Sequence, residues 1–152
     1  RLMEDLVRFA DPDSGMFYQV VDRADAAGNY LETSGSSMMA YAMLKGARLG
    51  ILKASFRDLG MKTFQGIVRK NLSFTGEELN LNSICLVAGL GPENNRRRDG
   101  TLAYYLSEPV VQNDAKGVAP LLLAYTEVRR IYTAQHARPG QPMSFARIKP
   151  NS

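Results

Sequence analysis

The sequence predicts a mainly helical fold in which helices form the two layers of a toroid. Residues 38–44 and 118–125 are apolar on every side when placed on a helix, which is typical of helices buried all round. Each follows a segment whose apolar residues lie on one face. A double-layered toroid requires this alternation, because inner helices are covered on both sides while outer helices meet solvent. A plain four-helix bundle would make every helix amphipathic.

The first predicted helix carries Leu2, Leu6 and Phe9 on one face. Several turn-forming residues at 11–15 end it. Residues 16–21 are aromatic and β-branched, so we expect a short strand or extended segment there, followed by a polar loop over 22–30. This part of the chain therefore predicts an outer helix and an extended entry to the next helix.

Three further helical and extended regions follow. We expect a buried helix from Thr33 or Ser34 to Leu49, and a one-sided helix from Ala54 or Ser55 to Asn71. The long connection after it contains predicted strands at 84–87 and 102–106. The last helix opens near residues 114–117 and runs to about residue 133. We divide the chain into a helical domain, residues 1–138, and a tail of unknown role, residues 139–152.

Composition excludes several classes of protein. The 152 residues suffice for one hydrophobic core, and no apolar run approaches the roughly 20 residues of a membrane span. Cys85 is the only cysteine, so an internal disulfide and a thiolate metal cluster are excluded. His136 has no His or Cys neighbour at ligand spacing. We therefore expect neither a metal site nor a cofactor.

The formal net charge is +4, and the one basic cluster is residues 96–98, between loop-forming neighbours. A solvated loop and a contact with an anionic ligand both explain this cluster. Nucleic-acid binding is not supported, because no interleaved aromatic residues or helical basic stripe accompany it.

Two polar loops lead into the apolar helices and form the predicted binding site. Thr33, Ser34 and Asp114 are suitable N-caps. In a toroid the N-termini of all inner helices also point to one end, where free N–H groups favour an anion such as a uronate carboxylate. Tyrosines on the preceding extended segments would stack on sugar faces. The candidate residues are Tyr18, Glu32, Thr33, Ser34, Gly35, Ser36, Asn113, Asp114, Lys116 and Gly117.

A general acid is harder to find in these loops. Glu32, Glu108 and Asp114 are the candidate carboxylates. A helix N-terminus would lower the pKa of Asp114 and make it a poor acid at neutral pH. The sequence alone does not decide between Glu32 and Glu108, and it contains no nucleophile–base pair and no phosphate-binding loop.

Several blocks together resemble glycoside hydrolase family 105, the unsaturated rhamnogalacturonyl hydrolases. The resemblance covers residues 11–130 in order. It is carried by residues 15–22 (GMFYQVVD), 29–37 (NYLETSGSS), 41–50 (YAMLKGARLG), 87–91 (VAGLG), 104–117 (YYLSEPVVQNDAKG) and 121–125 (LLLAY).

The resemblance implies an (α/α)6 barrel, of which this chain supplies the C-terminal part. It implies that an aspartic acid protonates the C4–C5 double bond of an unsaturated uronic acid, without a cofactor. That acid lies in the half of the family barrel that no block here matches, so no catalytic residue is transferred. The resemblance also implies a bacterial cytoplasmic or periplasmic protein, an unsaturated oligosaccharide as substrate, and either the N-terminal half of the barrel or self-association to complete the fold.

Two alternatives stay open. One is an unsaturated glucuronyl hydrolase acting on glycosaminoglycan products. The other is a helical-repeat module that binds carbohydrate or protein without catalysis, which the lack of an acid constellation supports.

Overall fold

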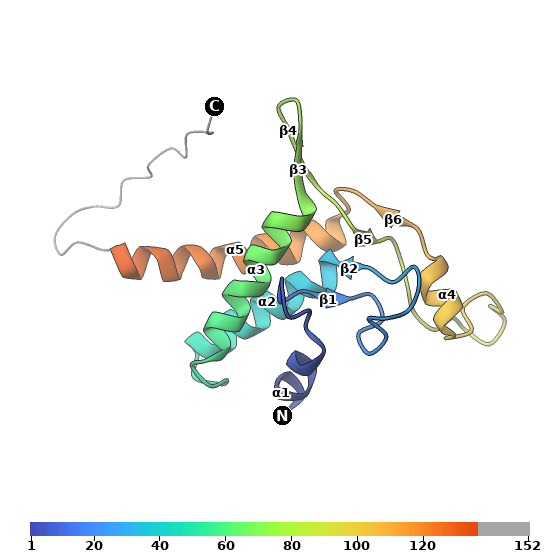
Figure 1. Ribbon diagram of the computed structural model, residues 1–152, viewed down its shortest axis with the longest axis horizontal. Helices are drawn as coiled ribbons and strands as arrows, with labels where there is room; N and C mark the ends of the chain where they lie inside the picture. Colours follow the sequence, from blue (N-terminus) through green and yellow to red (C-terminus); the bar gives the residue numbers. More distant parts are fainter. Residues whose placement is uncertain (137–152) are drawn as a thin grey trace.

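The computed structural model describes residues 1–136 and consists mainly of helices (Figure 1). The predicted tail, residues 139–152, lies outside the described residues. The helices are α1 (Leu2–Leu6), continued by the 3-10 turn η1 (Val7–Phe9), α2 (Thr33–Arg48), α3 (Phe56–Asn71), α4 (Leu102–Ser107) and α5 (Ala115–His136). The strands are β1 (Phe17–Tyr18), β2 (Leu31–Glu32), β3 (Leu72–Thr75), β4 (Glu78–Leu81), β5 (Ile84–Cys85) and β6 (Val110–Val111).

Helix α2 occupies the middle of the fold and packs against both α3 and α5. Helices α2 and α5 begin at the same end and run side by side in one direction, while α3 runs the opposite way (Figure 1). This is the predicted arrangement of two inner helices with an outer helix returning between them. The boundaries predicted for α2 and α3 agree with the structure within two residues.

Three two-stranded antiparallel sheets connect the helices. Strand β1 pairs with β2 in the entry to α2, and β5 pairs with β6 in the entry to α5. The hairpin β3–β4 projects from the end of α3 (Figure 1) and was not predicted. Its turn contains Gly76 at φ +62°, a left-handed conformation that glycine adopts without steric cost.

The predicted strand at residues 102–106 is wrong, because this segment forms α4. Thr101 caps this helix by accepting a hydrogen bond from the Tyr104 N–H, and Asp99 in turn accepts from both the N–H and the hydroxyl of Thr101. Such a cap favours a helix at an apolar run whose periodicity is ambiguous.

The core lies where α2, α3 and α5 meet the strands. One cluster of buried residues joins the extended entry to α2 with α3 and with the segment before α5: Met16, Ile67, Leu81 and Ile84. A second joins β1, α2 and α3: Phe17, Met43 and Phe56. The strands therefore serve to fix the loops at the N-terminal ends of the inner helices.

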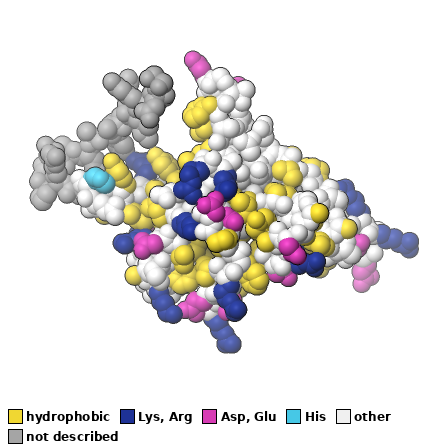
Figure 2. All heavy atoms as spheres, in the orientation of Figure 1, with side chains coloured by type: hydrophobic (Ala, Val, Ile, Leu, Met, Phe, Trp, Pro, Cys, Tyr) yellow, Lys and Arg dark blue, Asp and Glu magenta, His cyan; other side chains and the backbone are white. Residues whose placement is uncertain are grey.

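The prediction that both apolar helices are buried on all sides is wrong for the described residues. On α5, Leu122 is 57% exposed and Tyr125 is 42% exposed, and on α2 Met38 is 50% exposed. Apolar side chains are visible at many places on the face shown in Figure 2. The reason is that α5 packs mainly on α2 and touches α3 only locally, so that the described residues leave much of its surface uncovered. Among these residues no helix is long and apolar enough to cross a membrane.

Candidate functional site

The N-terminal ends of α2 and α5 are fixed to one short segment, residues 81–85. The Thr33 N–H, at the start of α2, donates to the Ser83 carbonyl over 2.9 Å, and the Asn113 N–H, just before α5, donates to the Leu81 carbonyl over 2.9 Å. The two predicted loops therefore lie side by side at one end of the fold, and this end is the candidate site.

Glu32 is the N-cap of α2, a role the sequence predicted for Thr33 or Ser34. Its carboxylate accepts hydrogen bonds from the N–H groups of Ser34 (3.0 Å) and Gly35 (2.5 Å). It also accepts from the N–H of Cys85 (3.0 Å), and its residue is only 4% exposed. The first turn of α2 thus already holds an anion of its own chain, so these N–H groups are not free for a uronate carboxylate.

Thr33 and Ser36 are buried, and both hydroxyls bind protein groups. The Thr33 hydroxyl donates to the Asn82 carbonyl over 2.6 Å and accepts from the Asn71 amide over 2.7 Å. The Ser36 hydroxyl accepts from the Phe17 N–H over 2.9 Å and donates to the Phe17 carbonyl over 3.3 Å. These two candidates hold α2 to its neighbours.

Ser34 and Gly35 are the members of this loop that stay partly exposed. The Ser34 hydroxyl donates to Glu32 over 2.7 Å, which leaves its oxygen able to accept a further hydrogen bond. A side chain at Gly35 would meet only the Glu32 carboxylate. Of the first loop, these two residues offer a surface that a ligand can approach.

At the second loop, Asn113 and Gly117 shape the backbone. Asn113 has φ +57°, an unusual value that its amide supports by accepting from the Leu81 N–H and donating to Asn80. Gly117 is buried against Ile84: a Cβ there would lie 2.5 Å from the Ile84 Cδ1. Both residues therefore position the start of α5, and the Asn113 amide is already bound to Leu81 and Asn80.

Asp114 and Lys116 form the charged part of the second loop. The Asp114 carboxylate accepts from the Lys116 N–H (2.9 Å), as an N-cap does, and pairs with the Lys116 ammonium (2.7 Å). The pKa of Asp114 is lowered, chiefly by the hydrogen bond from the Lys116 side chain. The predicted direction is thus confirmed. The Lys116 side chain is half exposed and keeps donors for a further anion.

The remaining candidate, Tyr18, lies on β1 and lines a pocket that also includes Phe9 and Asp22. Tyr104, a tyrosine on α4, is only 4% exposed, and its hydroxyl bonds to the backbone of Gly89. Of these two tyrosines, only Tyr18 is placed to meet a ligand.

A buried polar cluster next to Glu32 was not predicted as a site. The Gln19 amide donates to the Cys85 sulfur over 3.2 Å, and burial raises the pKa of the Cys85 thiol. Burial likewise raises the pKa of Tyr30, whose buried hydroxyl faces the same thiol. Cys85 itself is 8% exposed. The sequence contains the polar residues of this cluster, and also Asn80 and Asn82. Nothing in the sequence indicates that they lie close to the starts of α2 and α5.

The last candidate acid, Glu108, is 5% exposed and lies 3.5 Å from the Arg97 guanidinium. Arg97 belongs to the basic cluster at residues 96–98, so this cluster contributes a partner for a buried carboxylate. Glu32, Glu108 and Asp114 are therefore all engaged by groups of their own chain. Among the described residues there is no group of three His, Cys, Asp or Glu side chains that could hold a metal ion.

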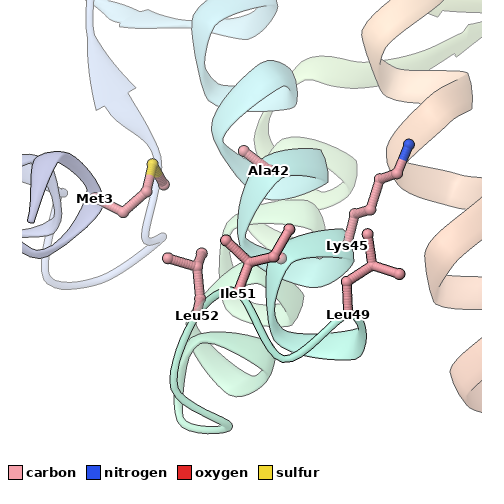
Figure 3. Close-up of a pocket in the computed structure, with 7 residues that line it drawn as sticks. Met3, Ala42, Lys45, Leu49, Ile51 and Leu52 are labelled. Carbon is pink, nitrogen blue, oxygen red and sulfur yellow. The ribbon is translucent and has the colours of Figure 1, made fainter.

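An apolar pocket of about 300 Å³ lies at the opposite end of α2. Figure 3 shows Met3 of α1 facing Leu52, with Leu49 and Ile51 on the loop that follows α2. Its one charged residue is Lys45, whose ammonium donates to the Tyr41 hydroxyl over 2.6 Å. This pocket holds none of the predicted site residues.

Comparison with known proteins identifies the family of this fold. The sequence profile of Glycosyl Hydrolase Family 88 matches residues 1–132. Protein Atu3128 of Agrobacterium fabrum is 44% identical over 119 residues, which are 75% of this chain and 51% of that protein. The chain therefore spans about half the length of this relative.

Solved structures of glycoside hydrolases also resemble this fold. A family 105 glycoside hydrolase from C. acetobutylicum has a TM-score of 0.79 and 44% identity, over 84% of this chain and 35% of that one. A possible family 105 member from Klebsiella pneumoniae has a TM-score of 0.69 and 27% identity, over 86% of this chain and 30% of that one. The described residues thus form part of an α/α barrel. The chain belongs to Glycosyl Hydrolase Family 88 and is similar to the structures of family 105, as the resemblance implied.

Proposed function

We propose that this chain forms one wall of the cleft of a hydrolase that removes 4,5-unsaturated uronic acid from oligosaccharides released by pectin (rhamnogalacturonan) lyases. The observation that carries the proposal is the placement of the two inner-helix N-termini side by side, in a chain that belongs to a glycoside hydrolase family. The surface groups offered to a ligand there are the Ser34 hydroxyl and the Lys116 ammonium, with Tyr18 on the neighbouring strand.

In this reaction an acid donates a proton to C4 of the C4–C5 double bond. Water adds its oxygen to C5 and gives one proton back to the conjugate base of that acid, so the net change is hydration of the double bond. The resulting hemiketal collapses and the partner sugar leaves. The role proposed for Lys116 is to attract the uronate carboxylate by charge. Ser34 accepts a hydrogen bond from a sugar hydroxyl, and Tyr18 packs against a ring face.

The proton donor is proposed to lie in the rest of the barrel. Glu32 is engaged by three backbone N–H groups, and Glu108 lies within 3.5 Å of the Arg97 guanidinium. Asp114 has a lowered pKa. A group with a lowered pKa stays ionised at neutral pH and is a poor acid. Because all three carboxylates are engaged by groups of their own chain, none of them is proposed as the proton donor.

The test compares this chain with a longer protein that contains it, by following the ultraviolet absorbance of the unsaturated uronate. We expect turnover by the longer protein and none by this chain alone. In the longer protein, Lys116→Ala should raise KM about 3- to 10-fold with little change in kcat, because it removes a binding contact. Lys70→Ala, a matched change on the outer helix, should alter neither. Turnover by this chain alone would contradict the proposal.

The partner proposed for the exposed apolar face of α5 is the rest of the barrel. Leu122, Leu123 and Tyr125 are each more than 40% exposed. An exposed apolar patch of this kind favours association. Without the other helices we expect this chain to self-associate, which light scattering would detect. A stable monomer at micromolar concentration would count against this partner.

Two observations support other functions. Membership of Glycosyl Hydrolase Family 88 supports a glycoside hydrolase without naming its saccharide, so an unsaturated glucuronyl hydrolase acting on glycosaminoglycan products is the second candidate. The engagement of all three candidate carboxylates supports a non-catalytic binding module. Assaying the longer protein with unsaturated disaccharides from both pectin and glycosaminoglycans distinguishes the three proposed functions. Each hydrolase would cleave its own disaccharide, whereas the binding module would bind a saccharide and cleave none.

A further inference from the structure

A second pocket lies beside β1, between the turn after η1 and the loop that follows Tyr18. Its volume is about 360 Å³, within the range of about 300–1,000 Å³ typical of small-ligand sites. Its lining combines two aromatic rings with charged groups. The residues that matter for the argument are Arg8, Phe9, Tyr18, Val21, Asp22 and Asp25.

Four charged or phenolic side chains of this pocket have no partner among the described residues. Within residues 1–136, no hydrogen bond or ion pair engages the side chains of Arg8, Tyr18, Asp22 or Asp25. By contrast Asp11, which also lines the pocket, accepts hydrogen bonds from both the N–H (2.8 Å) and the hydroxyl (2.5 Å) of Ser14. One guanidinium, one phenol and two carboxylates are thus available around the same cavity.

The apolar part of the lining suits the face of a sugar ring. Phe9 is 43% exposed, and Tyr18 and Val21 are half-buried. Aromatic rings bind the C–H face of a pyranose while neighbouring polar groups bind its hydroxyls. Carboxylates accept hydrogen bonds from sugar hydroxyls, and a guanidinium donates to ring and hydroxyl oxygens.

The charge of the lining decides which sugar fits. The pocket is lined by the carboxylates of Asp22 and Asp25, by that of Asp11, which also feels the charges of Lys62 and Lys70, and by the single guanidinium of Arg8. A uronate carboxylate placed here would be repelled, since like charges at short range are unfavourable. We propose that this pocket binds a neutral pyranose unit of the oligosaccharide. This inference rests on the proposed function for the class of ligand.

Tyr18 connects the pocket to the candidate site, because its strand β1 pairs with β2, which leads into α2. Tyr18 pairs with Leu31, and the next pair along the ladder is Phe17 with Glu32, the residue that caps α2. One oligosaccharide would then place its acidic sugar at the helix N-termini and a neutral sugar in this pocket. The two sites together would bind an acidic sugar next to a neutral sugar of the same oligosaccharide.

The experiment is saturation-transfer difference NMR on this chain, which tolerates self-association of the protein. The probes are methyl α-L-rhamnopyranoside and sodium D-glucuronate. We expect ring C–H signals from the neutral sugar and much weaker signals from glucuronate. Phe9→Ala and Tyr18→Ala should each lower the rhamnoside signal about threefold or more. Phe74→Ala, an exposed aromatic on the β3–β4 hairpin, is the matched control and should leave the signal unchanged.

A second pair of variants tests the charge selection without disturbing the core. Changing both Asp22→Asn and Asp25→Asn should raise the glucuronate signal, whereas Glu77→Gln at the hairpin tip should not. Equal signals from both probes with the unchanged protein would overturn the inference, as would a rhamnoside signal insensitive to Phe9→Ala and Tyr18→Ala. If the longer protein hydrolyses the unsaturated substrate while this chain gives no rhamnoside signal, only this inference fails.

Discussion

Arg48 holds Glu127 through two hydrogen bonds that join α2 to α5. The Nε–Oε2 distance is 2.6 Å and the Nη2–Oε1 distance is 2.9 Å, a bidentate geometry. The Glu127 side chain is 4% exposed, whereas that of Arg48 is 36% exposed. This pair fixes the inner helices at the end opposite the candidate site, so the two ends of the helix pair are fixed by different means.

Replacing Glu127 by Gln should lower the free energy of unfolding by about 1–2 kcal/mol, because one charge-assisted hydrogen bond is lost and another is weakened. The cost stays below the roughly 3–5 kcal/mol of a fully buried pair, since water reaches Arg48. Urea denaturation measures the change. Asp58→Asn, at an exposed pair with Arg57, is the control and should cost less than about 0.5 kcal/mol. Equal effects of the two changes would contradict this prediction.

The same carboxyl predicts a pH dependence. The pKa of Glu127 is lowered from its ordinary 4.5, first by the hydrogen bond from Arg48. The folded state therefore holds its proton less tightly than the unfolded state. Its contribution is complete above about pH 4.5 and is lost as pH falls through the folded pKa. The stability difference between the unchanged protein and Glu127→Gln should shrink from pH 5 to pH 3. A difference that stays constant over this range would refute the assignment.

Glu32→Ala should destabilise the fold by about 2–4 kcal/mol, because three N–H groups lose their acceptor and that of Cys85 is buried. Glu32→Gln keeps one acceptor oxygen and should cost less. Thermal or urea unfolding of both variants measures the order. If Glu32 were instead maintained for chemistry at the expense of stability, its removal would stabilise the protein.

Gly66→Ala should destabilise the fold, although alanine is the better helix former by about 1 kcal/mol. A Cβ at this position of α3 would collide with the Ser14 carbonyl, a backbone group that cannot move without shifting the loop. We expect a net loss of about 1–3 kcal/mol. Gln65→Ala, on the exposed side of the same helix, is the control and should stay within about 0.5 kcal/mol. A neutral or stabilising Gly66→Ala would show that the loop yields easily.

The helices were predictable from their apolar pattern, which is apolar all round in α2 and one-sided in α3. The pattern also indicated which helices are inner ones. The apolar pattern overestimated the burial of these helices. A pattern shows which side chains of a helix are apolar, but it does not show whether other described residues cover them. The strand predicted at residues 102–106 failed at a short apolar run, where the Asp99–Thr101 cap was the stronger signal. In the hairpin, Phe74 and Leu79 are exposed and the buried residues Asn80 and Leu81 are consecutive, so burial does not alternate along the strand and leaves no periodicity to recognise.

The sequence predicted which two loops form the candidate site, but not which of their side chains are free. The sequence located the two loops, and the structure brings them together. Which side chains are free was not predictable, because it depends on contacts between distant segments. Glu32 is engaged by Cys85, 53 residues away, and Asn113 by Leu81, 32 residues away. Spacing alone does not distinguish such a structural carboxylate or amide from one facing a ligand.

The anchoring of both inner helices to residues 81–85 has a consequence for how this end of the molecule opens. The Thr33 and Asn113 N–H groups donate to carbonyls only two residues apart, those of Ser83 and Leu81. Any fluctuation that lifts this short segment exposes both amides in one event, so their hydrogen-exchange rates should rise and fall together. Both loops of the candidate cleft would then open together, independently of the end that Arg48 and Glu127 hold. If mild denaturant changed the exchange rates of the two amides unequally, the two loops would move separately.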